Sequence, residues 1–185
     1  MRHPLSRQLG ASLLEVLVAI LILSFGMLAL SGMLAYAVQM PKLAAYRAAA
    51  TSLAASHIER MRANPQGFSK DNYKVGMTYG VESLPMLLTP CEYPLCNPDS
   101  IAARDSDETG KAIRNQLPGR SGMRVICKGA CTALDGDLWI IWQEPTTFAA
   151  LDAGSSDECP DASVDPTFTA FTDPKPRCLH VRFKL

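Results

Sequence analysis

The run of 23 uncharged residues from Val16 to Val38 constrains this chain more than any other feature of its sequence. About 20 apolar residues are enough to cross a bilayer as a helix, so the run predicts a helix of membrane length. A carboxylate, Glu15, directly precedes it. Moving a charged group into apolar surroundings costs several kcal/mol unless an opposite charge accompanies it. The position of Glu15 therefore needs an explanation.

The rest of the chain is polar. The whole chain of 185 residues includes 18 basic and 18 acidic side chains, so its formal net charge is zero. The sequence has no run of Lys and Arg and no basic patch, which argues against a nucleic-acid-binding protein. Residues 41–185 are rich in Pro, Gly and Asp and numerous enough to bury a modest core. We therefore expect one globular domain attached to an apolar helix.

Six cysteines all lie in the polar part, and an even number after an apolar N-terminal segment is typical of disulfides in an oxidising compartment. The C-x4-C and C-x3-C spacings fit a structural zinc site poorly, so we favour disulfides and expect no metal site and no cofactor. Fifteen connectivities are possible. Pairing of nearest neighbours is the simplest, and it gives Cys91–Cys96, Cys127–Cys131 and Cys159–Cys178.

The N-terminal segment allows three interpretations. As a secretory signal it would use Arg2 and Arg7 as its basic region and "AYA" at 35–37 as a cleavage site, leaving a secreted, disulfide-rich binding protein. Its apolar stretch is longer than the usual 7–15 residues. As a plain anchor it would place the C-terminus outside the cell. Neither interpretation gives Glu15 a role. The third interpretation is a helix that packs between subunits.

The stretch "GASLLEVLVAILIL", residues 10–23, resembles the class III signal of type IV prepilins. In that family a short basic leader ends in Gly, and an apolar helix with Glu at its fifth position follows. The resemblance implies that residues 1–10 are a leader peptide and that a prepilin peptidase cuts after Gly10. It also implies N-methylation of Ala11, where most relatives have Phe. Gly32 stands where many major pilins have proline, which disfavours a major pilin.

Cleavage after Gly10 would create a new cation, the α-amino group of Ala11, and methylation would keep its charge. Glu15 could then form an ion pair with the Ala11 amino group of a neighbouring subunit. The best-attested use of a buried ion pair is to fix the register of two packed elements, here the axial register of neighbouring subunits. The carboxylate would therefore serve assembly of a polymer.

The helix is expected to continue beyond the apolar run. An apolar stripe at alternating spacings of three and four residues predicts an amphipathic helix: Leu43, Tyr46, Ala50, Leu53, His57 and Met61. Pro41 should kink this helix and Asn64-Pro65 should end it. We thus expect one helix over about 12–63, with residues 11–40 as the transmembrane and filament-core part and 41–64 under the head. His57 is interpreted as a structural histidine.

The segment "ERMRANP", residues 59–65, is similar to the end of the long helix in PilV-type minor pilins. This resemblance implies an α+β type IV pilin fold, a long helix packed on an antiparallel sheet with disulfide-bonded loops. The implied partners are other minor pilins, the major pilin, a pilus tip adhesin, the prepilin peptidase and the inner-membrane assembly machinery. The implied location is the inner membrane, with the head in the periplasm, and afterwards the pilus. A minor pseudopilin of a type II secretion system is the alternative. Glu59, Arg60 and Arg62 are interpreted as a solvated helix end.

Residues 65–122 are expected to form a long connection with one hairpin in "YKVGMTYGVE" (73–82) and a short helix near 111–115. Residues 123–185 should contain the sheet and a C-terminal loop. Its strands are expected at 123–128, 137–144 and 178–185.

Asp135-Gly136 is interpreted as the turn between the first two of these strands. Trp139 and Trp142 should point to opposite faces, one in the core and the other either at a surface or interface or partly buried under a loop.

The sequence contains no P-loop, no dinucleotide-binding fingerprint and no G-x-S-x-G motif. Three acidic clusters lack the spacing of a calcium loop and are interpreted as solvated loop charge: Asp105, Asp107 and Glu108; Asp135 and Asp137; Asp157 and Glu158. We therefore expect no catalytic residue, and a protein that acts by assembly.

Overall fold

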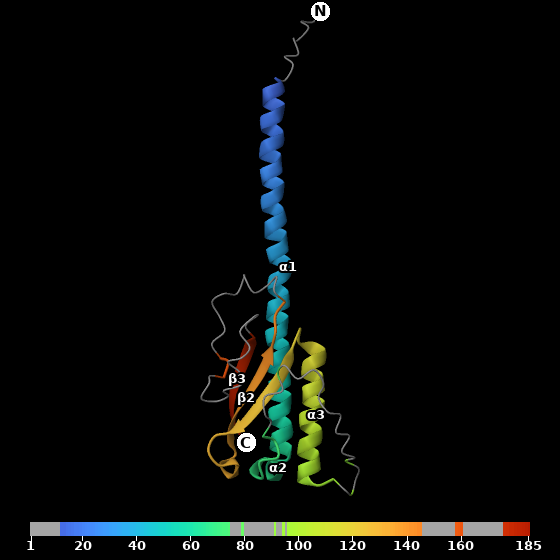
Figure 1. Ribbon diagram of the computed structural model, residues 1–185, viewed down its shortest axis with the longest axis vertical. Helices are drawn as coiled ribbons and strands as arrows, with labels where there is room; N and C mark the ends of the chain where they lie inside the picture. The colour runs from blue at the N-terminus through green and yellow to red at the C-terminus, as the bar shows by residue number, and fades with distance from the viewer. Residues whose placement is uncertain are drawn as a thin grey trace, which may run out of the picture. The chain divides into compact units, whose positions relative to one another are not determined.

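A computed structural model describes residues 12–74, 79, 91, 94, 96–145, 158–160 and 176–185 (Figure 1). The chain divides into two compact units, residues 1–42 and 43–185. The elements in chain order are α1 (Leu13–Ala63), α2 (Pro65–Ser69), α3 (Pro98–Gln116), β1 (Ser121–Cys127), the 3-10 turn η1 (Cys131–Ala133), β2 (Asp135–Trp142) and β3 (Arg177–Lys184). The leader, Ala11 and most of the expected hairpin at 73–82 lie outside the described residues.

Helix α1 is 51 residues long and runs through Pro41, and it begins and ends within one residue of the prediction. The helix ends at Ala63 because the next residue, Asn64, precedes Pro65, and a residue before a proline avoids helical dihedrals. Seven side chains of α1 are buried, all of them from Leu43 onward: Leu43, Ala50, Leu53, Ala54, His57, Ile58 and Met61. The predicted apolar stripe is confirmed, with Tyr46 partly buried at its edge.

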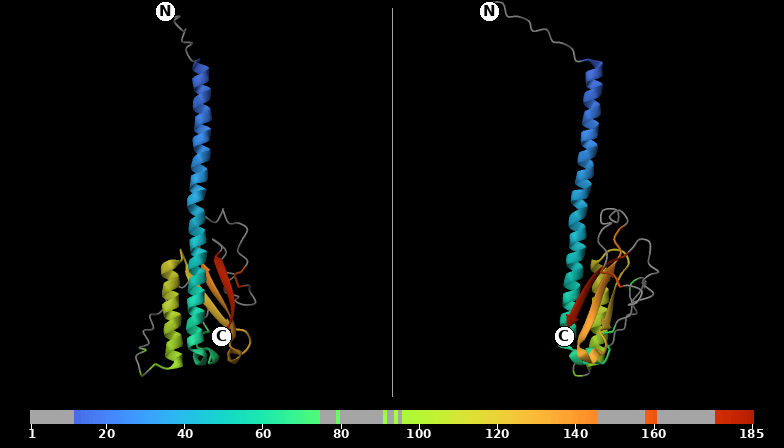
Figure 2. Two further views of the ribbon diagram at one scale, coloured as in Figure 1. Left: turned by 180° about the vertical axis from the view of Figure 1, so that it is seen from behind. Right: turned by 90° about the vertical axis from the view of Figure 1, so that its left-hand side faces the viewer.

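In the second unit, a three-stranded antiparallel sheet of order β1-β2-β3 carries α1 and α3 side by side on one face (Figure 2). The three strands lie within two residues of their predicted bounds. The main core fills the space between this face and the helices, with Met61, Ile113, Val125, Leu138 and Trp142 among its buried side chains. This unit is thus two layers around one core.

The opposite face of the sheet has a smaller cluster of Tyr79, Trp139 and Ile141. Trp139 and Trp142 therefore do point to opposite faces, as predicted. Of the two alternatives for the second tryptophan, a surface position is excluded and burial under a further segment is what the structure has, because Trp139 is 5% exposed and Trp142 is 1% exposed. The Trp139 indole nitrogen donates to the carbonyl of Glu158 at 3.0 Å, so a second segment covers this ring.

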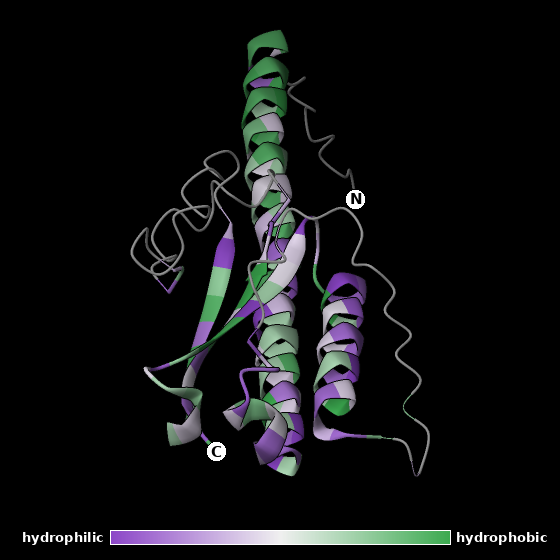
Figure 3. Ribbon diagram, turned by 60° about the horizontal axis from the view of Figure 1, so that its bottom comes forward, coloured by the Kyte–Doolittle hydropathy of each residue, from purple (hydrophilic) through white to green (hydrophobic). Residues whose placement is uncertain are grey.

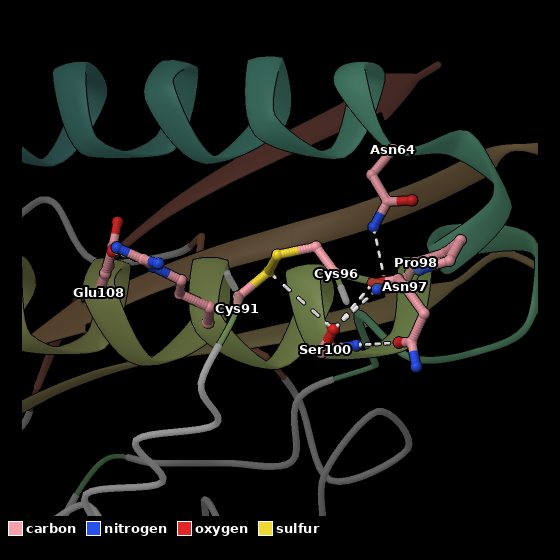
Figure 4. Close-up of a disulfide and its surroundings, with 8 residues drawn as sticks. Asn64, Cys91, Cys96, Asn97, Pro98, Ser100 and Glu108 are labelled. Carbon is pink, nitrogen blue, oxygen red and sulfur yellow. Dashed lines mark hydrogen bonds and ion pairs between the residues drawn. A yellow bond between two sulfur atoms is a disulfide. The ribbon is translucent and has the colours of Figure 1, made fainter. Parts of the chain in front are cut away.

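Residues 98–116 form a 19-residue helix, so the prediction of a long connection with a short helix near 111–115 is wrong here. A capping box starts the helix. The Asn97 side chain accepts from the Ser100 amide at 2.8 Å, and the Ser100 hydroxyl accepts from the Asn97 amide at 3.1 Å. Pro98 occupies the first turn, where proline is favoured. Figure 4 shows this start of α3 beside the Cys91–Cys96 disulfide.

The interpretation of Asp135-Gly136 as a turn is also wrong, since both residues belong to β2. The chain reverses earlier, through η1 and Leu134, whose φ of 57° is left-handed. Gly136 is needed for packing instead. A Cβ there would lie 2.7 Å from the Ile126 carbonyl oxygen and 2.8 Å from the Phe183 ring.

The structure contains three disulfides, and they join nearest neighbours along the chain: Cys91–Cys96, Cys127–Cys131 and Cys159–Cys178. The last one links the start of β3 to the segment that covers Trp139. A cross-link over such a loop stabilises the folded state by about 3 kcal/mol, because it lowers the conformational entropy of the unfolded chain. The disulfides thus secure the irregular segments around a small sheet.

Candidate functional site

The first part of α1 exposes apolar side chains around its whole circumference, and Figure 3 shows its ribbon mostly in the hydrophobic colour. Seventeen large apolar side chains between Leu13 and Val38 are 47–81% exposed, and they are all of the exposed large apolar side chains in the described part of the chain. The helix is long and apolar enough to cross a membrane, and no residue of the segment that meets this test is buried. It can therefore act as a membrane anchor or a signal sequence.

The two serine hydroxyls inside this segment are satisfied by the helix itself. The Ser24 hydroxyl donates to the carbonyl of Ile20 at 2.7 Å, and the Ser31 hydroxyl donates to the carbonyl of Met27 at 2.8 Å. Backbone and hydroxyl groups bonded in this way need no water. The segment is therefore compatible with lipid or with another apolar helix along its length.

Glu15 is the exception. It lies in the first turn of α1, where its amide donates to the carbonyl of Ser12 at 2.9 Å. Among the described residues it forms no ion pair. A carboxylate at this end of a helix gains about 0.3–1 kcal/mol from the helix dipole, which is less than the cost of placing it in an apolar medium. Its predicted partner, Ala11, and the predicted cleavage site at Gly10 lie outside the described residues.

The segment "ERMRANP" at the other end of α1 has a structural role, and Asn64 is its centre. The side-chain amide of Asn64 donates to the carbonyl of Pro98 at 2.7 Å (Figure 4). It also donates to the hydroxyl of Tyr73 at 3.3 Å. Its oxygen accepts from the Gly67 amide at 3.2 Å. One buried side chain thereby joins the ends of α1, α2 and α3, and this explains the asparagine in the motif.

Arg60 strengthens the same junction. Its guanidinium lies 3.1 Å from a carboxylate oxygen of Asp105 and 2.6 Å from one of Glu108, both on α3. Hydrogen bonds from Arg104 and Arg60 lower the pKa of Glu108. The interpretation of Arg60 as a solvated helix end is therefore wrong, whereas Glu59 and Arg62 pair with each other on the exposed face.

Two of the three acidic clusters likewise belong to paired helix and strand surfaces, while Asp157 of the third lies outside the described residues. Asp105 also accepts from the Tyr73 hydroxyl, and burial together with this hydrogen bond raises the pKa of Tyr73. On β2, Asp137 lies 2.8 Å from Nε2 of His180 and Asp135 lies 3.2 Å from the Arg182 guanidinium. The interpretation of these carboxylates as solvated loop charge is wrong.

His57 is buried in the core, as predicted for a structural histidine. Its Nδ1 shares a hydrogen bond of 2.9 Å with the hydroxyl of Thr109 on α3. Burial is the main cause that lowers the pKa of His57 to about 4. The ring is therefore neutral at physiological pH and ties α1 to α3 without carrying charge.

One group of side chains in the described part of the chain has the types and spacing of metal ligands. Oδ1 of Asp71, Sγ of Cys127 and Sγ of Cys131 lie within 4.8 Å of one another. The two sulfurs form a disulfide, and a sulfur in a disulfide is not the thiolate that binds metals.

Comparisons with protein-family models, with curated proteins and with solved structures found no match to this chain. Among the described residues, the exposed apolar part of α1 with Glu15 at its start is the feature that the chain's own fold does not explain.

Proposed function

We propose that this protein is a minor pilin of a type IV pilus with the α+β pilin fold. The observation that carries the proposal is the helix segment of residues 13–38, apolar on all sides and led by one carboxylate. The same helix continues into a unit where it packs on an antiparallel sheet with disulfides. For a chain that only needed an anchor, the small gain from the helix dipole would not offset the cost of placing the Glu15 charge in an apolar medium.

In this proposal a prepilin peptidase removes residues 1–10 at the inner membrane, and Ala11 becomes a methylated α-amino terminus. The head then lies in the periplasm until the subunit leaves the membrane for the pilus. Residues 11–40 form the transmembrane helix before assembly and filament core afterwards. The partners along this helix are other minor pilins and the major pilin.

In this proposal Glu15 determines the axial position of each subunit relative to its neighbour. When the helix moves from the bilayer into the filament, its carboxylate can remain charged only beside a cation, because an unpaired charge in an apolar interior costs several kcal/mol. The Ala11 amino group of a neighbouring subunit provides that cation. The pair forms at one axial offset only, which fixes the position of each subunit.

A minor pilin of this type primes filament assembly and stays at or near the tip with an adhesin, supporting twitching motility and adhesion. A deletion strain should therefore lose twitching and keep exoprotein secretion. Loss of secretion with normal twitching would instead favour a minor pseudopilin of a type II secretion system, which would share the same anchor.

Replacing Glu15 by Leu tests the pairing directly. Glu15→Leu should reach normal levels in the membrane, because Leu suits the apolar helix, but it should fall at least tenfold in sheared pili. Losing one partner of a buried ion pair costs about 3–5 kcal/mol, and 1.4 kcal/mol already corresponds to tenfold. Glu15→Asp is the matched control that keeps the charge, and it should be incorporated better than the Leu variant. Immunoblots that find equal Glu15→Leu and wild-type incorporation would contradict the pairing.

A further inference from the structure

Strand β3 lies at an edge of the described sheet, whose order is β1-β2-β3 (Figure 2). The backbone N–H and C=O groups of successive residues in a strand point to opposite sides of it, so only every second residue bonds to a given neighbour. The amide of Leu185 donates to the carbonyl of Leu134, just before β2, at 2.8 Å. The odd-numbered residues of β3 therefore face β2, and the backbone groups of Arg182 and Lys184 face away from it.

The chain itself satisfies one of the groups that face away from β2. The amide of His180 donates to a carboxylate oxygen of Glu158 at 3.0 Å, and the adjacent disulfide to Cys178 holds this segment at the start of β3. Among the described residues, no group bonds to the outward N–H or C=O of Arg182 or Lys184. The described segment thus covers the edge of β3 only as far as His180.

The side chains along the remaining edge form two rows of different character. On the face toward the helices, Val181 and Leu185 are apolar and partly buried against the core. On the opposite face, Arg182 and Lys184 are cations. The Arg182 guanidinium lies 3.2 Å from a carboxylate oxygen of Asp135 on β2, and its side chain is still 56% exposed. A guanidinium has five N–H donors, so Arg182 retains donors for a second carboxylate.

We propose that the edge of β3 at Arg182 and Lys184 binds an extended, antiparallel segment of a partner protein, with carboxylates at alternate positions and apolar residues between them. The carboxylates extend the row that Asp135 and Arg182 begin on one face, and the apolar residues cover Val181 and Leu185 on the other. In such strand addition, main-chain hydrogen bonds provide affinity and alternate side chains provide specificity. The proposal concerns the head and does not depend on the pilus.

A second copy of this chain fits the same edge less well. Antiparallel pairing of two β3 strands would place the cations of one copy against those of the other, and like charges directly opposite each other destabilise a sheet. Lysine on an edge strand commonly prevents such pairing. A partner strand with carboxylates turns the same cations, Arg182 and Lys184, into attractive contacts.

Amide hydrogen exchange of the full chain in detergent, followed by NMR, tests whether the edge is open. The Arg182 and Lys184 amides should exchange at least tenfold faster than those of Val181 and Phe183, which face β2. Slow exchange at Arg182 and Lys184 would overturn the proposal, because this chain or a second copy would then already occupy the edge.

The probe for binding is a capped peptide of alternating Glu and Val. At saturation it should slow exchange of the Arg182 and Lys184 amides at least tenfold. A peptide of alternating Lys and Val is the matched control and should not change their exchange. Unchanged exchange with the acidic peptide, or equal protection by both peptides, would overturn the proposal.

Methylated forms of the acidic peptide separate strand pairing from simple charge attraction. In an antiparallel pair, the residue opposite Arg182 has its side chain on the same face and its N–H directed at β3. The Glu amides of the peptide therefore bond to β3, and its Val amides point away. N-methylation of the Glu amides should weaken binding at least tenfold, whereas N-methylation of the Val amides should not. Equal affinities of the two methylated peptides would overturn the proposal.

A charge reversal tests the basic row. Lys184→Glu should weaken binding of the acidic peptide by about threefold or more, because an attractive surface contact becomes a repulsive one. Lys70→Glu is the matched control, since the Lys70 side chain is 59% exposed and follows α2, away from β3. It should bind the peptide as the wild type does. Equal affinities of the two variants would overturn the choice of an acidic partner.

Discussion

The two parts of α1 share one backbone and differ in what surrounds them. From Leu43 to Ala63 the helix buries seven side chains against its own sheet and α3, while its opposite side is exposed. From Leu13 to Val38 it is apolar on every side, and its large apolar side chains are all exposed. The first pattern is that of a helix with one partner surface, and the second is that of a helix surrounded by lipid or other helices. Among the described residues, the side chains of α1 that are packed against a partner surface belong to its second part.

A matched pair of methionine variants should show this difference most strongly. Met61 is fully buried and Met27 is 60% exposed. Met61→Ala should lower the free energy of unfolding by about 2–5 kcal/mol through lost burial and a cavity, whereas Met27→Ala should change it by less than about 0.5 kcal/mol. Denaturation in detergent, followed by the fluorescence of Trp139 and Trp142, measures both. A loss of more than about 1 kcal/mol in Met27→Ala would mean that the first part of α1 contacts the head.

Acid should lower the free energy of unfolding, because His57 in the second part of α1 is buried as a neutral ring. Its pKa is about 4 in the folded chain and 6.5 when exposed, so the unfolded chain binds the proton more tightly. Stability is therefore full above pH 6.5 and falls as the pH drops toward 4. From pH 7 to pH 4.5 this amounts to about 2–3 kcal/mol. Denaturation of wild type and His57→Gln at both pH values measures it, and the variant should lose much less over this interval. Equal losses in both proteins would contradict a neutral, buried His57.

Replacing a glycine by alanine should also affect stability differently at a packed position, Gly67, and at an exposed one, Gly26, although by less than the methionine variants. A Cβ on Gly67 would lie 2.5 Å from the Asn64 side-chain amide and 2.8 Å from the Pro98 carbonyl oxygen, whereas one on Gly26 would meet nothing within 4 Å. Gly67→Ala should cost about 1–3 kcal/mol. Gly26→Ala should be neutral for the head and favour the helix slightly. Thermal unfolding of both variants checks this, and a neutral Gly67→Ala would mean that Asn64 is not the fixed centre of the junction.

Much of this fold could be predicted because its signals are local. Asn64-Pro65 marked the end of α1, and alternating apolar residues marked the strands. Only the end of helix α3 was predicted, near 111–115, because the stretch before it, "NPDSIAARDSDETG" (residues 97–110), is polar and rich in Asp and Ser, which is typical of loops. Its helical signals were present in the sequence: the Asn97–Ser100 capping box, Pro98 in the first turn, and charge pairs four residues apart such as Arg104–Glu108.

Long-range pairings could not be predicted in the same way. Nothing in the sequence places Arg60 beside Asp105, or Asn64 against the carbonyl of Pro98, because these contacts depend on how α3 lies against α1. The same holds for Asp71 and Cys131, which are 60 positions apart. The role of Glu15, by contrast, was inferred from sequence alone, since its proposed partner belongs to another subunit.

The central proposal is that this chain is cleaved after Gly10 and that its helix then pairs with the helices of neighbouring pilin subunits. Mass spectrometry of the mature N-terminus, purified from cells with the pilus machinery, tests this most directly. We predict a chain that starts at Ala11 with a methylated α-amino group. A chain that starts at Val38, as after a signal peptidase, or one that keeps Met1 would contradict it.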